Sequence, residues 1–244
     1  MNKPVCLLLF ILTLPILAQV NVEQYRDGSG GLEAKYNEFF NISTAIRRST
    51  SSLYQIGIKY FRPFKFQKAN GFLLTKVNYG ETDSNPFINN SFYHLRFVSK
   101  DKFFDVQPEA FLQFENNSYS LTNQRYLAGI GVRYGEKNMT NGTSIINESY
   151  KESNGILELN NWRISQYLKM KFDLNPLNNL NITLYIQPSI VDLTNIRYYS
   201  ETTYASKIND MLTYNSTLTA KFFSKSSQYD QVEYFFESGL QFKI

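Results

Sequence analysis

Apolar and polar side chains alternate along most of the chain after about residue 30. The clearest case lies near the end of the sequence, where Val232, Tyr234 and Phe236 share one face and Glu233 and Glu237 share the other. Successive side chains of a β-strand point to opposite faces, so each such segment predicts a strand with one apolar and one polar face. The same split recurs in residues 125–134, 163–172, 182–187 and 212–222.

These segments are separated by turns rich in Asn, Asp, Ser, Gly and Pro, and the sequence contains no helical stripe, linker or change of composition. The pattern predicts about twelve antiparallel strands, near residues 31–40, 52–62, 70–80, 90–99, 103–116, 122–136, 142–151, 156–173, 180–190, 195–207, 210–223 and 230–244. An even number of strands is expected for a single-chain bacterial barrel.

Alternation alone fits a soluble sheet with one wet face as well as a barrel in a bilayer. Two features favour the bilayer. First, the polar faces have charged side chains at mid-strand, and a sandwich core does not hold many of these because each unpaired buried ion costs several kcal/mol. Second, aromatic side chains recur at strand ends on the apolar face, as an interfacial girdle requires, namely Tyr60, Tyr79, Phe97, Tyr134 and Tyr198. We therefore predict an all-β fold, an antiparallel transmembrane β-barrel.

The first residues predict an export signal. Lys3 supplies a positive charge, residues 5–17 are mostly apolar, and Ala18 precedes a polar stretch. This apolar run of 13 residues is short for a membrane-spanning helix, which needs about 20. We predict a signal peptide at 1–18, an N-terminal segment at 19–30 and a barrel at 31–244 in the outer membrane of a Gram-negative bacterium. The alternative is that the apolar run is retained as an N-terminal anchor.

Composition narrows the function classes. The sequence has 20 Phe and 18 Tyr but 4 Met, and ring side chains fit a pleated, half-buried surface. The net charge of +4 is small and the basic residues are scattered, so nucleic-acid binding is not predicted. Cys6, the only cysteine, lies in the predicted signal, so a disulfide-stapled domain is excluded. No metal-ligand cluster or nucleotide-binding loop occurs, and no cofactor is expected.

Residues 237–244 resemble the C-terminal signal of bacterial outer-membrane barrels. The matching positions are Gly239 and Phe242, and Ile244 departs from the pattern because phenylalanine is usual at that position. A strand of this kind offers unpaired backbone groups that the barrel-assembly machinery captures by strand addition. The alternative is an ordinary last strand.

Residues 89–136 resemble a known family. His94-Leu95-Arg96-Phe97, Glu109-Ala110-Phe111-Leu112-Gln113-Phe114 and Arg125–Tyr134 occur in that order. This block is similar to the salt-stress-induced outer-membrane protein family (domain of unknown function 481). The resemblance implies a barrel in the outer membrane and supplies no activity or catalytic residue. Residues 137–160 fit the family poorly, which leaves the seventh strand in doubt.

Charged and polar side chains on the predicted inner face are the candidate functional residues: Lys59, Lys76, His94, Arg96, Glu109, Gln113, Arg125, Arg133, Arg163 and Lys169. If the fifth and sixth strands form a hairpin, Glu109 and Gln113 are expected to meet Arg125 or Arg133 across it. Gly129 and Gly131 would let long side chains lie across the wall. These groups form either a ladder of ion pairs that fills the lumen or the lining of a charge-selective pore.

The leading hypothesis is a monomeric, porin-like or structural barrel that contacts outer-membrane lipid and has no catalytic residues. A second hypothesis is a secreted soluble β-sheet protein that binds an apolar ligand. A third is a barrel-embedded lipid hydrolase that uses His94, the only histidine, with Ser91. Because a catalytic triad is defined by geometry, their closeness along the sequence does not establish one.

Overall fold

The protein is a closed barrel of twelve antiparallel strands. The computed structural model describes residues 38–48, 52–82, 85–117, 122–136, 138–152, 155, 157–226 and 229–243. The strands are β1 (Phe39–Arg48), β2 (Ser52–Lys65), β3 (Ala69–Thr82), β4 (Asn85–Ser99), β5 (Gln107–Asn117), β6 (Thr122–Glu136), β7 (Met139–Glu152), β8 (Leu157–Asp173), β9 (Asn178–Pro188), β10 (Ile196–Lys207), β11 (Leu212–Ser226) and β12 (Tyr229–Lys243).

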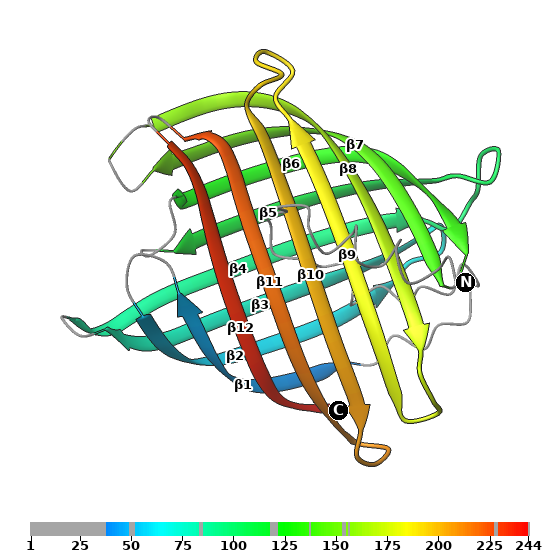
Figure 1. Ribbon diagram of the computed structural model, residues 1–244. Helices are drawn as coiled ribbons and strands as arrows, with labels where there is room; N and C mark the ends of the chain where they lie inside the picture. Colours follow the sequence, from blue (N-terminus) through cyan, green and yellow to red (C-terminus); the bar gives the residue numbers. More distant parts are fainter. Residues whose placement is uncertain are drawn as a thin grey trace, which may run out of the picture.

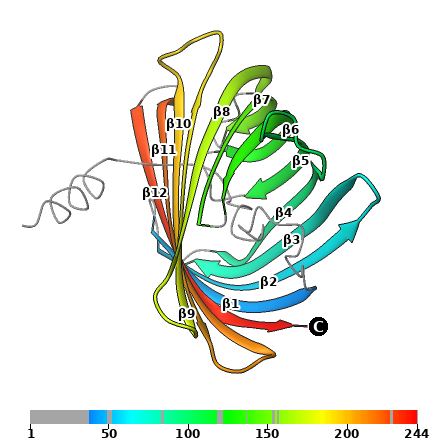
Figure 2. The ribbon, with the colours of Figure 1, turned by 90° about the vertical axis from the view of Figure 1, so that its right-hand side faces the viewer.

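Each strand pairs with its neighbours in the sequence, and β12 closes the barrel by pairing with β1. In Figures 1 and 2 the wall of β10–β12 faces the wall of β2–β5 across the interior. Closure leaves no strand edge unpaired, which removes the usual site of edge-to-edge aggregation. Among the described residues, no α-helix is long and apolar enough to cross a membrane.

The predicted fold class and strand number are confirmed, and eleven of the predicted strands lie within a few residues of the observed ones. The prediction for the first strand was wrong, because residues 31–40 were expected and β1 is Phe39–Arg48. The inward residues Asn41 and Ser43 are small and polar and face the crowded junction with β12, so the strand lacks the strong alternation seen elsewhere. Residues 31–37 and the predicted signal peptide lie outside the described residues.

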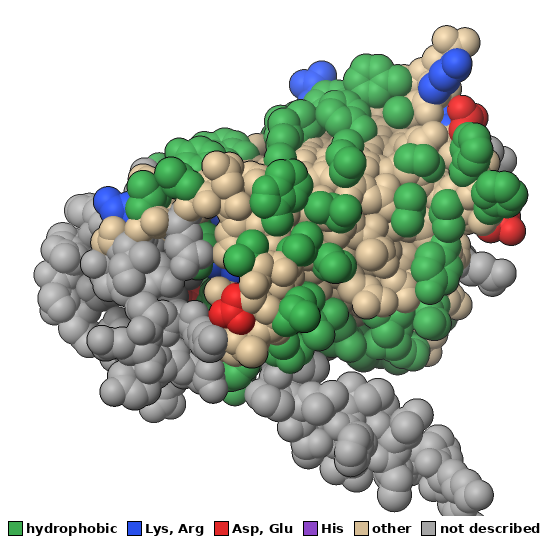
Figure 3. All heavy atoms as spheres, turned by 90° about the horizontal axis from the view of Figure 1, so that it is seen from above, with side chains coloured by type: hydrophobic (Ala, Val, Ile, Leu, Met, Phe, Trp, Pro, Cys, Tyr) green, Lys and Arg blue, Asp and Glu red, His purple; other side chains and the backbone are tan. Residues whose placement is uncertain are grey.

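The two faces of the wall differ as the alternation predicts. Outward side chains are largely apolar and open to the surroundings, including Ile56 (61% exposed) and Ile130 (69% exposed). Figure 3 shows one such face, where hydrophobic side chains spread among uncharged ones and few charged side chains are visible. The predicted girdle residues Tyr79, Phe97 and Tyr134 are exposed, and Tyr60 and Tyr198 are half-buried on the same face.

Aromatic rings fill much of the interior, which the sequence pattern did not anticipate. A row of stacked or tilted rings follows the inner wall from β1 to β4, with centroids 5.0 Å apart for Phe39 and Phe61, 5.3 Å for Phe61 and Phe72, and 5.8 Å for Phe72 and His94. Tyr167, Tyr185 and Tyr199 form a second row on β8–β10. The barrel therefore has an internal core, as a soluble protein does.

Gly129 provides space for part of this core. A Cβ atom at Gly129 would lie 2.4 Å from Phe111 Cζ and 2.9 Å from Ile146 Cγ2. The Phe111 ring therefore lies across the β6 backbone, as the sequence suggested for this glycine. A Cβ atom at Gly131 would likewise lie 2.5 Å from Ser144 Cβ.

We expect Gly129→Ala to lower the free energy of unfolding by about 2 kcal/mol, because the added methyl group overpacks the interior against Phe111. Urea unfolding of the refolded barrel, followed by the fluorescence of Trp162, the only tryptophan, measures this. Ala128→Val, on the exposed outer side of the same strand, is the control and should change stability little. Equal stability of both variants would contradict this packing.

Candidate functional site: the charged lumen

The ten predicted inward residues all lie on the inner face of the barrel. Lys59 and Lys76 are half-buried, and the side chain of each is 12% exposed. The remaining eight are between 0% and 8% exposed: His94, Arg96, Glu109, Gln113, Arg125, Arg133, Arg163 and Lys169. Charged side chains this deeply buried destabilise a protein unless they are paired. The partners of each one therefore determine whether the interior is filled or open.

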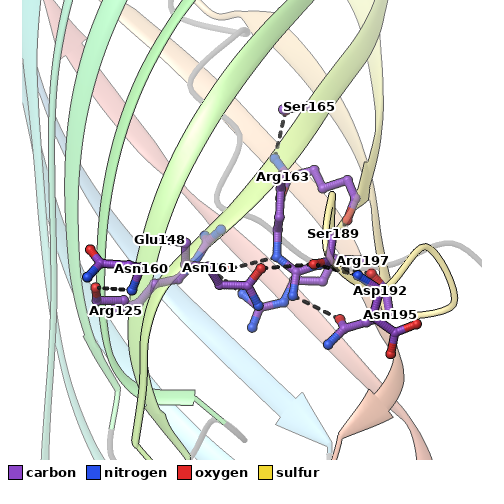
Figure 4. A network of polar contacts seen from close by, with 12 residues as sticks. Arg125, Glu148, Asn160, Asn161, Arg163, Ser165, Ser189, Asp192, Asn195 and Arg197 are labelled. Carbon is purple, nitrogen blue, oxygen red and sulfur yellow. Dashed lines mark hydrogen bonds and ion pairs between the residues drawn. The ribbon is translucent and has the colours of Figure 1, made fainter.

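Glu148 on β7 is the centre of the largest cluster (Figure 4). Its carboxylate forms ion pairs with Arg125 on β6, with Arg163 on β8 at 2.8 Å, and with Arg197 on β10. Glu148 and Arg163 are both fully buried. Because β8 and β9 lie between β7 and β10, the pair with Arg197 extends past two strands along the inside of the barrel. Three guanidinium groups on one carboxylate leave an excess of positive charge here.

Arg163 also holds the connection between β9 and β10. Its Nη1 donates to the backbone oxygens of Gln187 (3.0 Å) and Asn195 (3.1 Å), and its Nη2 donates to Asn195 Oδ1 (2.8 Å). Residues 189–195 are thereby tied to β8, with a further bond from Ile190 N to Trp162 O at 2.8 Å. Hydrogen bonds to a charged group are stronger than neutral ones, so Arg163 anchors the base of this connection, while Val191 (87% exposed) and Leu193 (68% exposed) project away from the barrel.

A second cluster lies around Glu237 on β12. Its carboxylate pairs with Lys76 on β3 and with Lys59 on β2 at 3.6 Å, and it accepts a 2.7 Å hydrogen bond from Ser43 Oγ on β1. The closing strands β12, β1 and β2 are therefore joined inside the barrel as well as through the backbone. Gly239, two residues further on, opposes Ser43, and a Cβ atom there would lie 2.4 Å from Ile42 O.

One ion pair crosses the whole lumen. Lys221 Nζ on β11 lies 3.5 Å from Glu115 Oε1 on β5, and five strands separate these two strands in either direction around the barrel. A circular barrel of twelve strands tilted by about 40° would be roughly 24 Å wide between opposite backbones. A lysine and a glutamate side chain together do not span that width. The two walls have therefore approached each other, and the lumen is narrow where the pair forms.

His94 lies in a stack of rings and polar groups near β4 and β5. Its Nε2 accepts a hydrogen bond from Arg96 Nε at 3.2 Å, and its Nδ1 lies 3.4 Å from Gln113 Oε1. Because an arginine can only donate, the imidazole proton sits on Nδ1 and is directed at Gln113. Arg96 in turn lies 3.6 Å from Glu109 and stacks 4.5 Å above the Phe111 ring. His94 is thus a structural hydrogen-bonding residue.

The expected direct pairs between β5 and β6 were wrong. The register places Gly131 opposite Glu109 and Leu127 opposite Gln113. Gln107, opposite Arg133, accepts a hydrogen bond from it at 3.3 Å. Arg125 forms its ion pair with Glu148 on β7, the strand on the other side of β6 from β5. The alternation predicted the face of each side chain correctly. In the observed register, however, Arg133 and Arg125 lie two residues from the positions opposite Glu109 and Gln113.

The candidate residues omitted five charged residues that form ion pairs inside the barrel: Glu115, Glu148, Arg197, Lys221 and Glu237. Glu237 and Lys221 were recognisable from their polar face, but nothing in a single sequence indicates which charges meet across a barrel. Glu148 lies in the Asn-rich segment where the alternation is weak, because β7 has polar side chains on both faces.

The lipid-hydrolase hypothesis fails on its proposed pair. Ser91 and His94 are three residues apart on β4, and a strand places such residues on opposite faces. His94 is buried inside, whereas Ser91 lies on the outer face. Within the described ranges, no group of three or more His, Cys, Asp or Glu side chains is arranged to hold a metal ion.

Comparison with solved structures shows the same fold in a porin. The NanC porin, solved in a rhombohedral crystal form, superposes with a TM-score of 0.56 over 84% of this chain and 100% of that chain, at 10% identity. The KdgM porin in complex with disordered oligogalacturonate gives a TM-score of 0.49 over 84% and 99%, at 9% identity. The anion-selective porin from Comamonas acidovorans gives 0.46 over 85% and 98%, at 5% identity.

No protein-family model and no curated protein matches the chain. The resemblance of residues 89–136 to the salt-stress-induced family therefore stays a prediction. At 10% identity the likeness to the NanC porin demonstrates a shared fold.

We expect Glu148→Gln to lower the free energy of unfolding by about 3 kcal/mol, because it leaves three arginines buried without their carboxylate. Asp173→Asn is the matched control, since its ion pair with Lys171 is exposed and should contribute less than about 1 kcal/mol. Urea titration of both refolded variants against the wild type measures the difference. A loss no larger than that of the control would show that the Glu148 cluster is not a stabilising centre.

Proposed function

We propose that this chain is an outer-membrane β-barrel of porin type whose lumen is closed in its resting state by ion pairs across the interior. Such a protein contributes to the envelope as a structural barrel, and it conducts only when those ion pairs separate. The observation that carries the proposal is the contact between Glu115 and Lys221 on opposite walls.

The outer surface of the barrel supports a membrane location. The outer wall exposes large apolar side chains such as Ile130 and Leu112, while arginine, lysine and glutamate side chains face inward. Soluble monomeric proteins rarely expose apolar patches above a few hundred Å². A closed barrel with an apolar outer face satisfies every backbone group in hydrocarbon. The shared fold with a protein named as a porin agrees with this location.

Two sequence features agree with export and assembly. The predicted signal at 1–18 would direct the chain to the periplasm. In β12, Gly239 packs against β1 and Phe242 is 42% exposed on the outer wall. Ile244 lies outside the described residues. We propose that this strand is recognised by the barrel-assembly machinery before it pairs with β1.

A secreted soluble protein that holds an apolar ligand is the runner-up. Its ligand would need an apolar interior, and the aromatic row from Phe39 to Phe72 offers one. The charged clusters around Glu148 and Glu237 oppose it, because an apolar ligand would remove the remaining water from them. The outer wall would also be apolar surface in contact with water.

Cell fractionation tests the location. We expect the expressed chain in the outer-membrane fraction, with faster gel migration unheated than heated, because closed barrels resist denaturation by detergent. Recovery of an unmodified chain from the soluble periplasm, stable at high concentration without detergent, would support the soluble ligand-binding alternative and exclude the barrel proposal.

Planar-bilayer recording tests the closed lumen. We expect the wild type to show no steady current, because paired side chains cross the interior. The double variant Glu115→Ala, Lys221→Ala removes both side chains of the pair that crosses the lumen, while Glu148 keeps its three arginines. This variant should conduct, and it should favour anions because the positive charge of the cluster still exceeds its negative charge.

Arg62→Ala, at an exposed position on β2, is the control and should stay silent. Each variant is first checked for heat-modifiable migration, which shows that it has folded. A wild type with a steady current would overturn the closed lumen. A folded Glu115→Ala, Lys221→Ala barrel without current would show that this ion pair does not close the lumen.

A further inference from the structure

One strand of the outer wall differs from the others. The outward side chains of β7 are Met139, Asn141, Thr143, Ile145, Asn147, Ser149 and Lys151, and between Met139 and Lys151 only Ile145 is apolar. On β8 the outward Gln166 lies directly opposite Thr143. We name Asn141, Thr143, Asn147 and Gln166 the polar seam.

The polar seam lies level with the apolar band of its neighbour. On β6 the exposed Tyr126 and Tyr134 mark the two ends of the outward apolar run, and Ala128, Ile130 and Val132 lie between them. The register places Asn147 opposite Ala128 and Thr143 opposite Val132. Thr143 and Asn147 therefore lie within the apolar band, where lipid tails would surround them, and Asn141, opposite Tyr134, lies at its end.

These side chains lack what they need in hydrocarbon. Thr143 and Gln166 are exposed on the outer wall, and Asn147 is half-buried beside them. Lipid tails offer no donor or acceptor, so amides facing them lose the hydrogen bonds they make in water. A protein surface that presents hydrogen-bonding groups at the same depth would satisfy them.

We propose that the polar seam is the contact surface for a second copy of this chain within the membrane, in place of the monomer expected from the sequence. This inference rests on the proposed membrane location. Asn and Gln side chains each have a donor and an acceptor, and the seam has no formal charge, so the same patch turned by 180° pairs with itself without repulsion. Because the barrel is closed and has no free strand edge, the contact is made by side chains.

The shape of the wall beside the seam agrees with a two-fold axis near Ile145. On one side Trp162, opposite Asn147 and 49% exposed, stands out from β8. On the other side the wall has a hollow of about 710 Å³. Its lining includes Ala110, Ile130 and Thr143. A two-fold axis between them brings the indole of one copy towards the hollow of the other, where a large aromatic side chain can anchor an interface.

Sedimentation velocity in detergent tests the interface. We expect the wild type to sediment as a dimer, and the triple variant Thr143→Val, Asn147→Leu, Gln166→Leu to raise the dimer dissociation constant at least tenfold. Apolar side chains on the outer wall do not impair folding of the barrel. The control is Thr44→Val, Thr75→Val, Thr202→Val, which removes outward hydroxyl groups from β1, β3 and β10 and should leave the dimer intact.

Cross-linking in intact membranes provides a second readout. In a Cys6→Ser background, Ile145→Cys should give a disulfide-linked dimer on oxidation, and Ile56→Cys, 61% exposed on β2, should not. A heat-modifiable barrel that sediments as a monomer and gives no Ile145→Cys cross-link would overturn the interface alone. Recovery of the chain in the soluble fraction would overturn the membrane location and the interface together.

Discussion

The structure depends on one constraint: ionised side chains inside a closed β-barrel must find partners inside it. The outer wall is apolar, and the backbone is fully paired around the ring, so inward charges have only one another, a few hydroxyl and amide groups, and whatever water fits. Three groups of ion pairs satisfy this constraint: Glu148 with three arginines, Glu237 with two lysines, and Glu115 with Lys221. Each one joins strands that are not neighbours.

These contacts narrow the interior of the barrel. Twelve strands in a circular ring would leave a passage, but the Glu115–Lys221 pair brings opposite walls together and rows of rings occupy part of the interior. The interior therefore resembles a protein core with polar clusters in it. Breaking a buried pair leaves a charge without compensation, so the closed state is favoured until something replaces the lost partner. This interior is the basis of the proposal that the barrel is closed in its resting state.

The sequence was sufficient for the fold because the period of two persists through most of the twelve strands, all but β1 and β7, and identifies the face of each residue there. It placed Arg125, Arg163 and Lys59 inside without any knowledge of their partners. The partners depend on register and on which walls face each other, and neither is encoded in local alternation. Glu148 was missed for a related reason: β7 is polar on both faces, so its pattern does not separate lumen from exterior. The same property produces the polar seam.

A double-mutant cycle between Glu115 and Lys221 tests the central claim most directly, since these residues meet only if opposite walls approach across the lumen. Glu115→Gln, Lys221→Met and the combined variant would be unfolded in urea from the refolded barrel. The closed-lumen account predicts a coupling energy of about 1 kcal/mol or more, within the range measured for residues in contact. Additive effects of the two substitutions would contradict it, because charges on separate walls of an open passage do not couple.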